Sequence, residues 1–296
     1  MKKLFILLAI LFLGSITLLA ETEEGAREHF INGNDYLRFG FFDMAIECYQ
    51  KTIELDQNNV NAYFNMGLAY GHKGNYDKAI ECYQKTIELN PEDAVSYNNM
   101  GNAYGQIGNN KKEIEFYQKA IEIEPDYALA HYNMGNANAD KGNYNKAIKC
   151  YKKAMKIDPE DTSVYYNMGL AYHEKENYDK AIECYQKTIE IDPDYTDVYI
   201  NMGVAYGIIG NSDKAIEFCQ KAIEVDPEEA DLYYYLGLSY ALKELDISAA
   251  NNLYRAGLLY LKQKNRPEIL KTIDIMKMYT PDSPLIQKLT DKLYEE

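Results

Sequence analysis

The amino-acid sequence predicts an all-α protein built from helical hairpins that stack on one another. The main indication is an internal repeat of 34 residues, which brings back the string Asn-Met-Gly at Asn65, Asn99, Asn133, Asn167 and Asn201. Two further sets keep the same period: the prolines Pro91, Pro125, Pro159, Pro193 and Pro227, and the alanines Ala45, Ala79, Ala147, Ala181 and Ala215. Such a period is typical of supersecondary units that bury their apolar faces only against their neighbours.

Each unit has the pattern of two helices joined by a tight turn. In the second unit, the i, i+3, i+4, i+7 spacing of a buried helical face is met by Tyr63, Met66, Gly67 and Tyr70. Gly74 and Asn75 then interrupt the pattern and predict the turn. The buried face of the second helix is expected at Ala79, Tyr83 and Thr86. Pro91 ends that helix, because proline cannot continue it.

This pattern resembles the tetratricopeptide repeat (TPR). Its signature of an aromatic, an aliphatic plus Gly, Tyr, Ala, an aromatic, Ala and Pro is met at Tyr63, Met66, Gly67, Tyr70, Ala79, Tyr83, Thr86 and Pro91. The resemblance implies a right-handed α-solenoid over residues 26–263, with repeats at 26–59, 60–93, 94–127, 128–161, 162–195 and 196–229 and a degenerate seventh at 230–263. Residues 264–296 are expected to form two capping helices, at 267–278 and 283–294.

The first twenty residues are expected to direct export. Lys2 and Lys3 precede an uncharged stretch of 17 residues, and the acidic Glu21 follows it. Apolar cores of signal peptides run to roughly 7–15 residues and membrane-spanning helices need about 20, so residues 1–20 fit a cleaved signal peptide or an uncleaved N-terminal anchor. The expected location is periplasmic or secreted, with contact to the inner membrane only through residues 1–20 if they stay attached.

The charge of the chain argues against nucleic acid as a partner. Its 46 Asp and Glu residues outnumber 31 Lys and Arg residues, for a net charge of −15, which would repel phosphate groups. The second helices carry Glu–Lys pairs at i, i+4, namely Glu47–Lys51, Glu81–Lys85, Glu115–Lys119, Glu183–Lys187 and Glu217–Lys221, expected on a solvated outer face. The fourth repeat departs from this with a basic strip of Lys146, Lys149, Lys152, Lys153 and Lys156. The strip is either simple variation or a surface for an acidic partner or for self-association.

No residue constellation predicts chemistry, so we expect no catalytic, cofactor or metal site. Four of the five cysteines share one repeat position, which Phe116 and Phe218 fill elsewhere. Equivalent positions in stacked helices lie at least about 8–10 Å apart, whereas a disulfide needs Cα atoms within about 4.4–6.8 Å. The cysteines are therefore expected to be free and packed. His29 and His131 stand at the aromatic position of a first helix and are expected to pack there.

Two polar residues break the repeat pattern. Glu113 stands where other clear repeats have alanine, and Asn138 stands where first helices have tyrosine. One interpretation is sequence drift. The other is a hydrogen-bonded Glu113–Asn138 pair where the third and fourth repeats meet, because a buried carboxylate without a partner would be costly.

The TPR resemblance implies that the first helices line a concave groove that binds peptides. A clamp for an acidic C-terminus is disfavoured, because the expected groove positions hold no basic residue: Phe30, Asn34, Phe64, Leu68, Asn98, Asn102, Tyr132 and Asn136. An asparagine ladder fits better, with one rung per repeat at Asn65, Asn99, Asn133, Asn167 and Asn201. An amide side chain can donate to and accept from a peptide backbone at once. Phe64, Tyr132 and Tyr166 beside the ladder would add apolar contact.

The alternative is a merely solvated polar stripe, since Asn before this Met-Gly pair is common in TPR sequences. The function expected from the sequence is a non-catalytic scaffold in the cell envelope that binds a protein or peptide in its groove. The second expectation is a structural or self-associating envelope component that acts through its outer faces.

Overall fold

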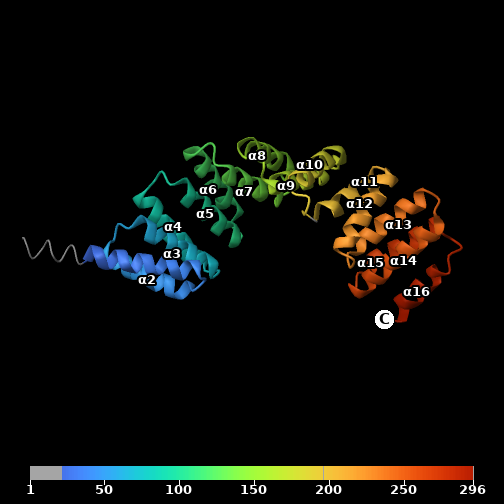
Figure 1. Ribbon diagram of the computed structural model, residues 1–296, viewed down its shortest axis with the longest axis horizontal. Coiled ribbons are helices and arrows are strands. Elements are labelled where there is room, and N and C mark those ends of the chain that lie inside the picture. Colours follow the sequence, from blue (N-terminus) through green and yellow to red (C-terminus); the bar gives the residue numbers. More distant parts are fainter. Residues whose placement is uncertain (1–21, 196, 296) are drawn as a thin grey trace, which may run out of the picture. The chain divides into compact units, whose positions relative to one another are not determined.

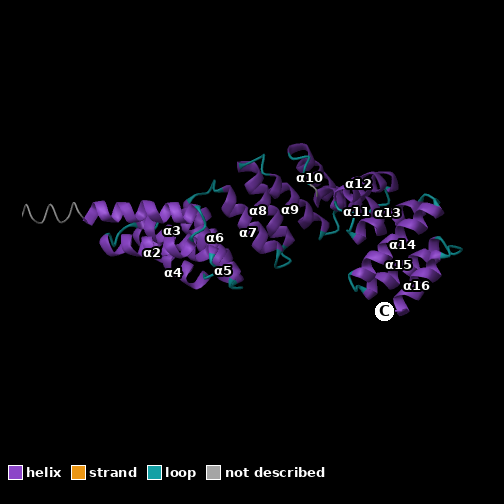
Figure 2. Ribbon diagram, turned by 60° about the horizontal axis from the view of Figure 1, so that its bottom comes forward, coloured by secondary structure: helices purple, strands orange, loops and turns teal. Residues whose placement is uncertain are grey.

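The structure is a computed structural model that describes residues 22–195 and 197–295. The expected export segment lies outside the described residues. Every regular element in the described parts of the chain is a helix (Figure 2). The chain divides into two compact units, residues 1–142 and 143–296. The boundary falls between the two helices of the fourth predicted repeat.

The first unit is a stack of antiparallel helical hairpins (Figure 1). It begins, as far as it is described, with a helix that contains residues 22–38. The helices that follow are α2 Phe42–Leu55, α3 Val60–His72, α4 Tyr76–Leu89, α5 Ala94–Gln106, α6 Asn110–Ile123 and α7 Ala128–Ala139. Each of α2 to α6 packs against the next helix along the chain. The alternation of first and second helices thus follows the 34-residue period.

The second unit continues the pattern and then departs from it. Its helices are α8 Tyr144–Ile157, α9 Thr162–His173, α10 Tyr178–Ile191, α11 Asp197–Ile208, α12 Ser212–Val225, α13 Ala230–Leu242, α14 Asp246–Lys262, α15 Arg266–Tyr279 and α16 Leu285–Glu295. The last two lie where capping helices were expected. They bury Ile269, Met276 and Leu289 with Leu253 of α14 in one apolar cluster. This cluster covers the apolar face of the last hairpin, which a stack of repeats would otherwise leave open.

Glycine, tyrosine and alanine explain why each hairpin closes tightly. A Cβ atom on Gly67 of α3 would lie 2.6 Å from Cε1 of Tyr83 in α4, so only glycine leaves room for the ring. Gly101 and Tyr117 make the same contact between α5 and α6, and Gly169 and Tyr185 make it between α9 and α10. These tyrosine side chains are buried, as are the alanines of the period, so the repeat signature forms the core of each hairpin.

The Gly-Asn pairs make the turns by two separate effects. Gly74 has φ of 73°, a left-handed conformation that costs other residues energy. Asn75 then caps α4, because its side chain accepts a hydrogen bond from the backbone N–H of Lys78. Glu176 occupies the left-handed position in the fifth repeat with φ of 58°, so the turn conformation persists even where glycine is absent.

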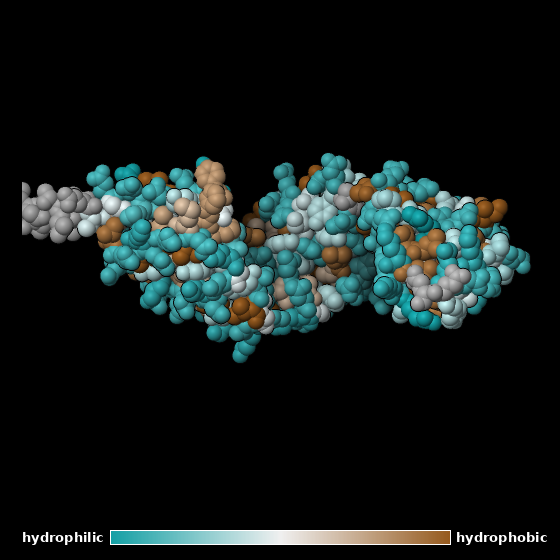
Figure 3. All heavy atoms as spheres, turned by 90° about the horizontal axis from the view of Figure 1, so that it is seen from below, coloured by the Kyte–Doolittle hydropathy of each residue, from teal (hydrophilic) through white to brown (hydrophobic). Residues whose placement is uncertain are grey.

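The outer face is solvated, but its ion pairs differ in part from those expected. Glu115–Lys119 and Glu217–Lys221 are paired at 3.3 and 2.8 Å. Lys85 and Lys187 instead pair with acids three residues later, Glu88 and Glu190. The predicted Glu81–Lys85 and Glu183–Lys187 pairs are therefore wrong. A long lysine side chain reaches i−4 and i+3 acids equally well, and both are present. The face seen in Figure 3 is largely hydrophilic, with separate hydrophobic patches.

Candidate partner-binding surface

The five ladder asparagines are half-exposed on first helices, at one position per repeat. Asn65 lies on α3, Asn99 on α5, Asn133 on α7, Asn167 on α9 and Asn201 on α11. This placement is what the period predicts. Their hydrogen bonds show a role that the sequence did not reveal.

Several ladder amides connect consecutive first helices within the protein. Asn65 Nδ2 donates to Asn34 Oδ1 at 2.8 Å, and Asn133 Nδ2 donates to Asn98 Oδ1 at 3.0 Å. In the second unit, Asn201 Nδ2 donates to the Tyr166 hydroxyl and to the Asp197 carbonyl, both at 3.1 Å. Tyr132, Asn136 and Asn167 also have interaction partners. Part of the ladder therefore stabilises the stacking of repeats, which reduces what it can offer to a ligand.

Tyrosines from the second helices hold two of the groove asparagines by their oxygen atoms. The Tyr49 hydroxyl donates to Asn34 Oδ1 at 2.9 Å, and the Tyr117 hydroxyl donates to Asn102 Oδ1 at 2.6 Å. The amide NH2 groups of Asn34 and Asn102 make no hydrogen bond to another described residue. Fixing the oxygen inward leaves these two donors free at the face of the first helices.

The third repeat contains a buried amide donor without a partner among the described residues. Asn98 is almost fully buried, and its Nδ2 has no hydrogen-bond partner among the described residues although its Oδ1 accepts from Asn133. Asn99, one residue on, makes no side-chain hydrogen bond within the described chain. A buried donor without an acceptor costs roughly 1–3 kcal/mol, so water or a bound group with an acceptor atom would stabilise this part of α5.

The aromatic residues beside the ladder are partly used for packing. Phe64 lies against Tyr83 with ring centroids 6.0 Å apart, and Tyr166 contacts Tyr185 and Tyr195 at 6.2 and 4.9 Å. Burial raises the pKa of Tyr166, and Asp197 adds to this effect. Both rings stay half-exposed, so each keeps a surface for apolar contact.

Glu113 and Asn138 do not form the predicted pair. Asn138 Nδ2 donates to the Met134 carbonyl of its own helix at 2.7 Å. The Glu113 carboxylate lies against Gly105 of α5, where a Cβ atom would come within 2.5 Å of Glu113 Oε1. Burial raises the pKa of the Glu113 carboxyl, and the nearby Asp140 raises it further. The small Gly105 leaves room for the acid, and a hydrogen bond with Tyr117 partly offsets the rise of its pKa.

His173 is a half-buried titratable group that sequence reasoning did not single out. It lies at the end of α9, edge-on to the Tyr178 ring with centroids 5.1 Å apart. Its Nδ1 and the hydroxyl of Tyr185 are both buried without a hydrogen-bond partner among the described residues. Burial lowers the pKa of His173. Of the other histidines, His131 is buried with Nε2 2.9 Å from the Pro125 carbonyl oxygen, and His29 is half-buried.

All five cysteines are free thiols. Four are buried, and Cys48 is partly exposed. Burial raises the pKa of Cys82, Cys184 and Cys219 to about 12, because it disfavours the thiolate. No group of three or more His, Cys, Asp or Glu side chains in the described chain is arranged to hold a metal ion.

The basic strip lies on the outer side of α8. Lys146, Lys149, Lys152, Lys153 and Lys156 are all exposed. None of them forms an ion pair with another described residue, and Lys152 Nζ lies 6.0 Å from the centre of the Tyr172 ring. Lys146 lacks the tyrosine that its counterparts Lys78, Lys112, Lys180 and Lys214 lie over, since Asn138 stands at that position. The strip is therefore available to an anionic surface.

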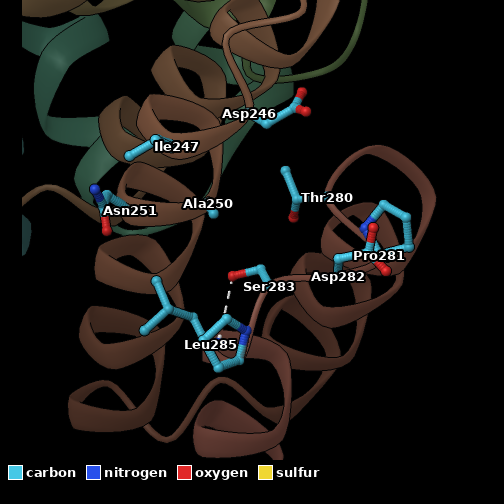
Figure 4. Close-up of a pocket in the computed structure, with 10 residues that line it drawn as sticks. Asp246, Ile247, Ala250, Asn251, Thr280, Pro281, Asp282, Ser283 and Leu285 are labelled. Atoms are coloured by element: carbon cyan, nitrogen blue, oxygen red, sulfur yellow. Dashed lines mark hydrogen bonds between the residues drawn. The ribbon is translucent and has the colours of Figure 1, made fainter.

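A pocket of about 430 Å³ lies between the start of α14 and the connection from α15 to α16 (Figure 4). Ile247 of α14 is 81% exposed at this pocket, and Thr280 and Leu285 lie across from it. Asp246 and Asp282 supply two carboxylates. The lining can contact a basic group with an apolar portion. The sequence offered no signal for it, because it forms where the repeat pattern ends.

Comparison with known families fits these hairpins. Tetratricopeptide repeat models match residues 60–93, 162–195, 196–229 and 82–115, and a TPR repeat model matches 33–74, 109–142 and 135–176. The chain belongs to the tetratricopeptide repeat family. Its fold is the all-α solenoid of TPR hairpins with C-terminal capping helices that the sequence predicts. In the described residues, no helix has both the length and the apolar character to cross a membrane.

Solved TPR structures resemble it over a large part of the chain. A structure of MamA is 31% identical and covers 58% of this chain and 93% of its own, with a TM-score of 0.53. YrrB, described as a TPR protein with an unusual peptide-binding site, is 25% identical and covers 62% of this chain and 94% of its own, with a TM-score of 0.51. PilF of Pseudomonas aeruginosa, at 15% identity over 72% of this chain and 96% of its own, shares the fold with a TM-score of 0.62. A comparison with curated proteins finds no match.

Proposed function

We propose that this TPR protein is a non-catalytic scaffold that binds an extended peptide along its first helices. The observation that carries the proposal is the set of free amide NH2 groups on Asn34 and Asn102, whose oxygens Tyr49 and Tyr117 hold inward. Donors fixed in this way suit the carbonyl oxygens of a peptide backbone. The peptide-binding site described for YrrB supports this assignment, because that protein resembles this one in sequence and fold.

The ladder asparagines contribute to peptide binding through the amide hydrogens that their internal hydrogen bonds do not use. Asn65 and Asn133 each use one amide hydrogen toward the preceding repeat and keep the other. Asn99 has its whole amide available. In the first unit, Asn136 and Tyr132 complete the surface and Phe64 offers a ring face to side chains. In the second unit, Asn167 and Tyr166 offer contacts of the same kind. Because the donors address main-chain atoms, this groove selects an extended backbone more than a particular sequence.

The experiment is a pull-down from cell extract with the full chain in mild detergent. The test variant combines Asn34→Leu, Asn99→Ala and Asn102→Leu; leucine is the natural residue at the equivalent Leu68 and Leu170. Loss of three hydrogen bonds of about 1 kcal/mol each should weaken a partner's binding by roughly two orders of magnitude. Asn110→Ala on the exposed start of α6 is the matched control and should retain the partner.

Retention of the same proteins by the folded triple variant would contradict binding through the first helices. In that case the second candidate function, self-association or bridging through outer faces, gains support. The observation that favours this candidate is the unpaired basic strip of α8. Self-association of that kind would be lost on Lys149→Glu with Lys153→Glu and weakened by salt, which screens exposed charges.

We further propose that the protein works in the cell envelope after export through residues 1–20. The support is the basic start and the uncharged stretch of that segment. The intact mass of the protein isolated from its own cells tests this: a mature chain that lacks these residues indicates a cleaved signal. A full-length chain in the cytosolic fraction would exclude export.

A further inference from the structure

Two equivalent pockets lie on the side of the first helices opposite to the asparagine ladder, one in each compact unit. In the first unit, α4, α5 and α6 enclose about 300 Å³ over Tyr97, Tyr104 and Phe116. In the second unit, α10, α11 and α12 enclose about 210 Å³ over Tyr199, Tyr206 and Phe218. The two sets are 102 residues apart, which is three repeats. On α5, Tyr97 and Tyr104 lie about 140–160° around the helix from Asn99 and Asn102, because each residue turns by about 100°.

A phenylalanine in place of the usual cysteine produces both pockets. Phe116 and Phe218 occupy the position that Cys48, Cys82, Cys150 and Cys184 hold in other repeats. Phe116 stacks on Tyr104 with an interplanar angle of 11° and on Tyr97 with 26°. Phe218 repeats this with Tyr206 at 18° and Tyr199 at 27°. Tyr104 and Tyr206 are buried, while the other two rings of each triplet stay half-exposed. Each triplet therefore makes an aromatic wall that cysteine could not form.

Two lysines lie at the edge of each aromatic wall, and one lysine of each pair has no acidic partner. Lys112 Nζ lies 4.7 Å from the Tyr104 ring and Lys119 Nζ lies 4.8 Å from the Phe116 ring. In the second unit, Lys214 lies over Tyr206 and Lys221 over Phe218 at 5.3 and 5.1 Å. Lys119 and Lys221 are paired with Glu115 and Glu217, whereas Lys112 and Lys214 form no ion pair with a described residue. Glu190 also lines the second pocket, where it is paired with Lys187. Each pocket therefore combines an apolar wall with one lysine that forms no ion pair with a described residue.

We propose that these pockets are docking sites for an acidic peptide segment in which a large apolar side chain stands next to a carboxylate. The apolar side chain enters between the rings, and the carboxylate pairs with Lys112 or Lys214. Each volume is several times the roughly 30 Å³ that a water molecule takes up, so a side chain fills it better than single waters do. Cation–π contact holds each lysine in place before the ligand arrives.

Because each unit has one pocket, a partner that carries two such segments on a linker long enough to reach both pockets can bind to both. Binding of the first segment raises the local concentration of the second, and avidity then exceeds the affinity of either segment alone. This surface is separate from the proposed peptide groove, since it uses the opposite side of the first helices and the neighbouring second helices. A single scaffold can then hold an extended chain on one face and a bivalent acidic partner on the other.

The probe is a fluorescent peptide with the segment Asp-Phe-Asp-Leu in one copy, and a second peptide with two copies joined by about 20 Gly and Ser residues. Fluorescence anisotropy with the full chain measures the dissociation constants. We expect the two-copy probe to bind at least about tenfold more tightly than the one-copy probe. Phe116→Cys or Phe218→Cys alone should reduce it to the one-copy level, and the double variant should abolish binding of both probes.

The substitutions to cysteine are safe for the fold, because four other repeats carry cysteine at this position. Lys112→Gln with Lys214→Gln provides a second variant that keeps the rings and should remove the salt dependence. The triple groove variant of Asn34, Asn99 and Asn102 is the control and should bind the probes like the native chain, which separates this site from the proposed groove. Failure of the native chain to bind, equal binding by the double cysteine variant, or loss in the groove variant would each overturn the proposal.

Discussion

The third hairpin, in the first unit, and the fifth hairpin, in the second unit, differ at one contact between their first and second helices. In each hairpin one helix supplies a large polar side chain and the other a small residue, but the two helices exchange these roles. In the third, the first helix supplies Gly105 and the second supplies Glu113. In the fifth, the first helix supplies His173 and the second supplies the equivalent Ala181. In the sixth hairpin both residues are small, and a Cβ atom on Gly207 would lie 4.0 Å from the Ala215 Cβ. The contact thus accepts one large polar side chain from either helix, provided that the opposite residue is small.

The two hairpins respond to pH in opposite directions. Burial raises the pKa of Glu113, so the folded state disfavours its ionised form and this destabilisation grows as pH rises through the acid range. Burial lowers the pKa of His173, so the folded state disfavours the protonated ring and stability falls as pH drops below its ordinary value of 6.5. The fifth hairpin therefore loses stability as the pH falls, because of His173, and the third hairpin loses stability as the pH rises through the acid range, because of Glu113.

The largest expected effect concerns a contact that the two hairpins share. Gly101→Ala and Gly169→Ala should each destabilise the protein by about 2 kcal/mol, because the added Cβ would meet the buried rings of Tyr117 and Tyr185 at 2.6 and 2.4 Å. Urea unfolding measures the change. Gly71→Ala is the matched control and should be neutral or stabilising by up to about 1 kcal/mol, since the added Cβ would lie 4.0 Å from the Tyr83 hydroxyl oxygen, an ordinary contact distance. Equal effects at all three glycines would refute the packing argument.

A smaller effect should separate the fifth hairpin from the third. His173→Ala removes the edge contact with Tyr178 and should cost about 1 kcal/mol at pH 7.5. As pH falls from 7.5 to 5, the native protein loses the stability that depends on a neutral His173, so the difference between native and variant should shrink. Unfolding free energies at several pH values check this. A difference that stays constant over this range would mean that His173 titrates alike in both states.

The smallest effect is a gain in the third hairpin. Glu113→Ala restores the alanine of the repeat and should stabilise the protein on the order of 0.5 kcal/mol at pH 7, after allowance for solvent screening of a partly exposed group. The gain should vanish as pH falls through the acid range, where the carboxyl protonates. Thermal unfolding measures it, with the exposed Glu115→Ala as control. A loss of stability at pH 7 would show that Glu113 contributes a favourable contact instead.

The fold could be predicted from the sequence because the residues that determine each hairpin lie close together in the chain and recur with the same period. A left-handed glycine such as Gly74, a capping Asn75 and the Gly67–Tyr83 contact recur with the same period, so each hairpin specifies itself. Which acidic residue a long lysine side chain pairs with could not be predicted in the same way. Lys85 has an acid on both sides along its helix and pairs with Glu88.

The sequence predicted on which helices the ladder asparagines lie, but not the hydrogen bonds that they make. The period places Asn65 and Asn133 on first helices, yet it contains no sign that their amides donate to the preceding repeat. An amide has the same pattern in sequence whether its acceptor belongs to the chain or to a ligand. The two aromatic pockets were missed although Phe116 and Phe218 were visible as exceptions, because the stacking on Tyr104 and Tyr206 depends on three-dimensional packing.

The buried thiols make the local opening of individual hairpins measurable. Cys82, Cys150, Cys184 and Cys219 lie in four different second helices, each shielded from solvent and held in its unreactive protonated form. Only the thiolate attacks an alkylating reagent, so modification of each cysteine waits for its hairpin to open. The rate at which each thiol is labelled therefore reports the opening of one hairpin. A single labelling time course, read by mass spectrometry, would rank the hairpins by local stability without any added probe.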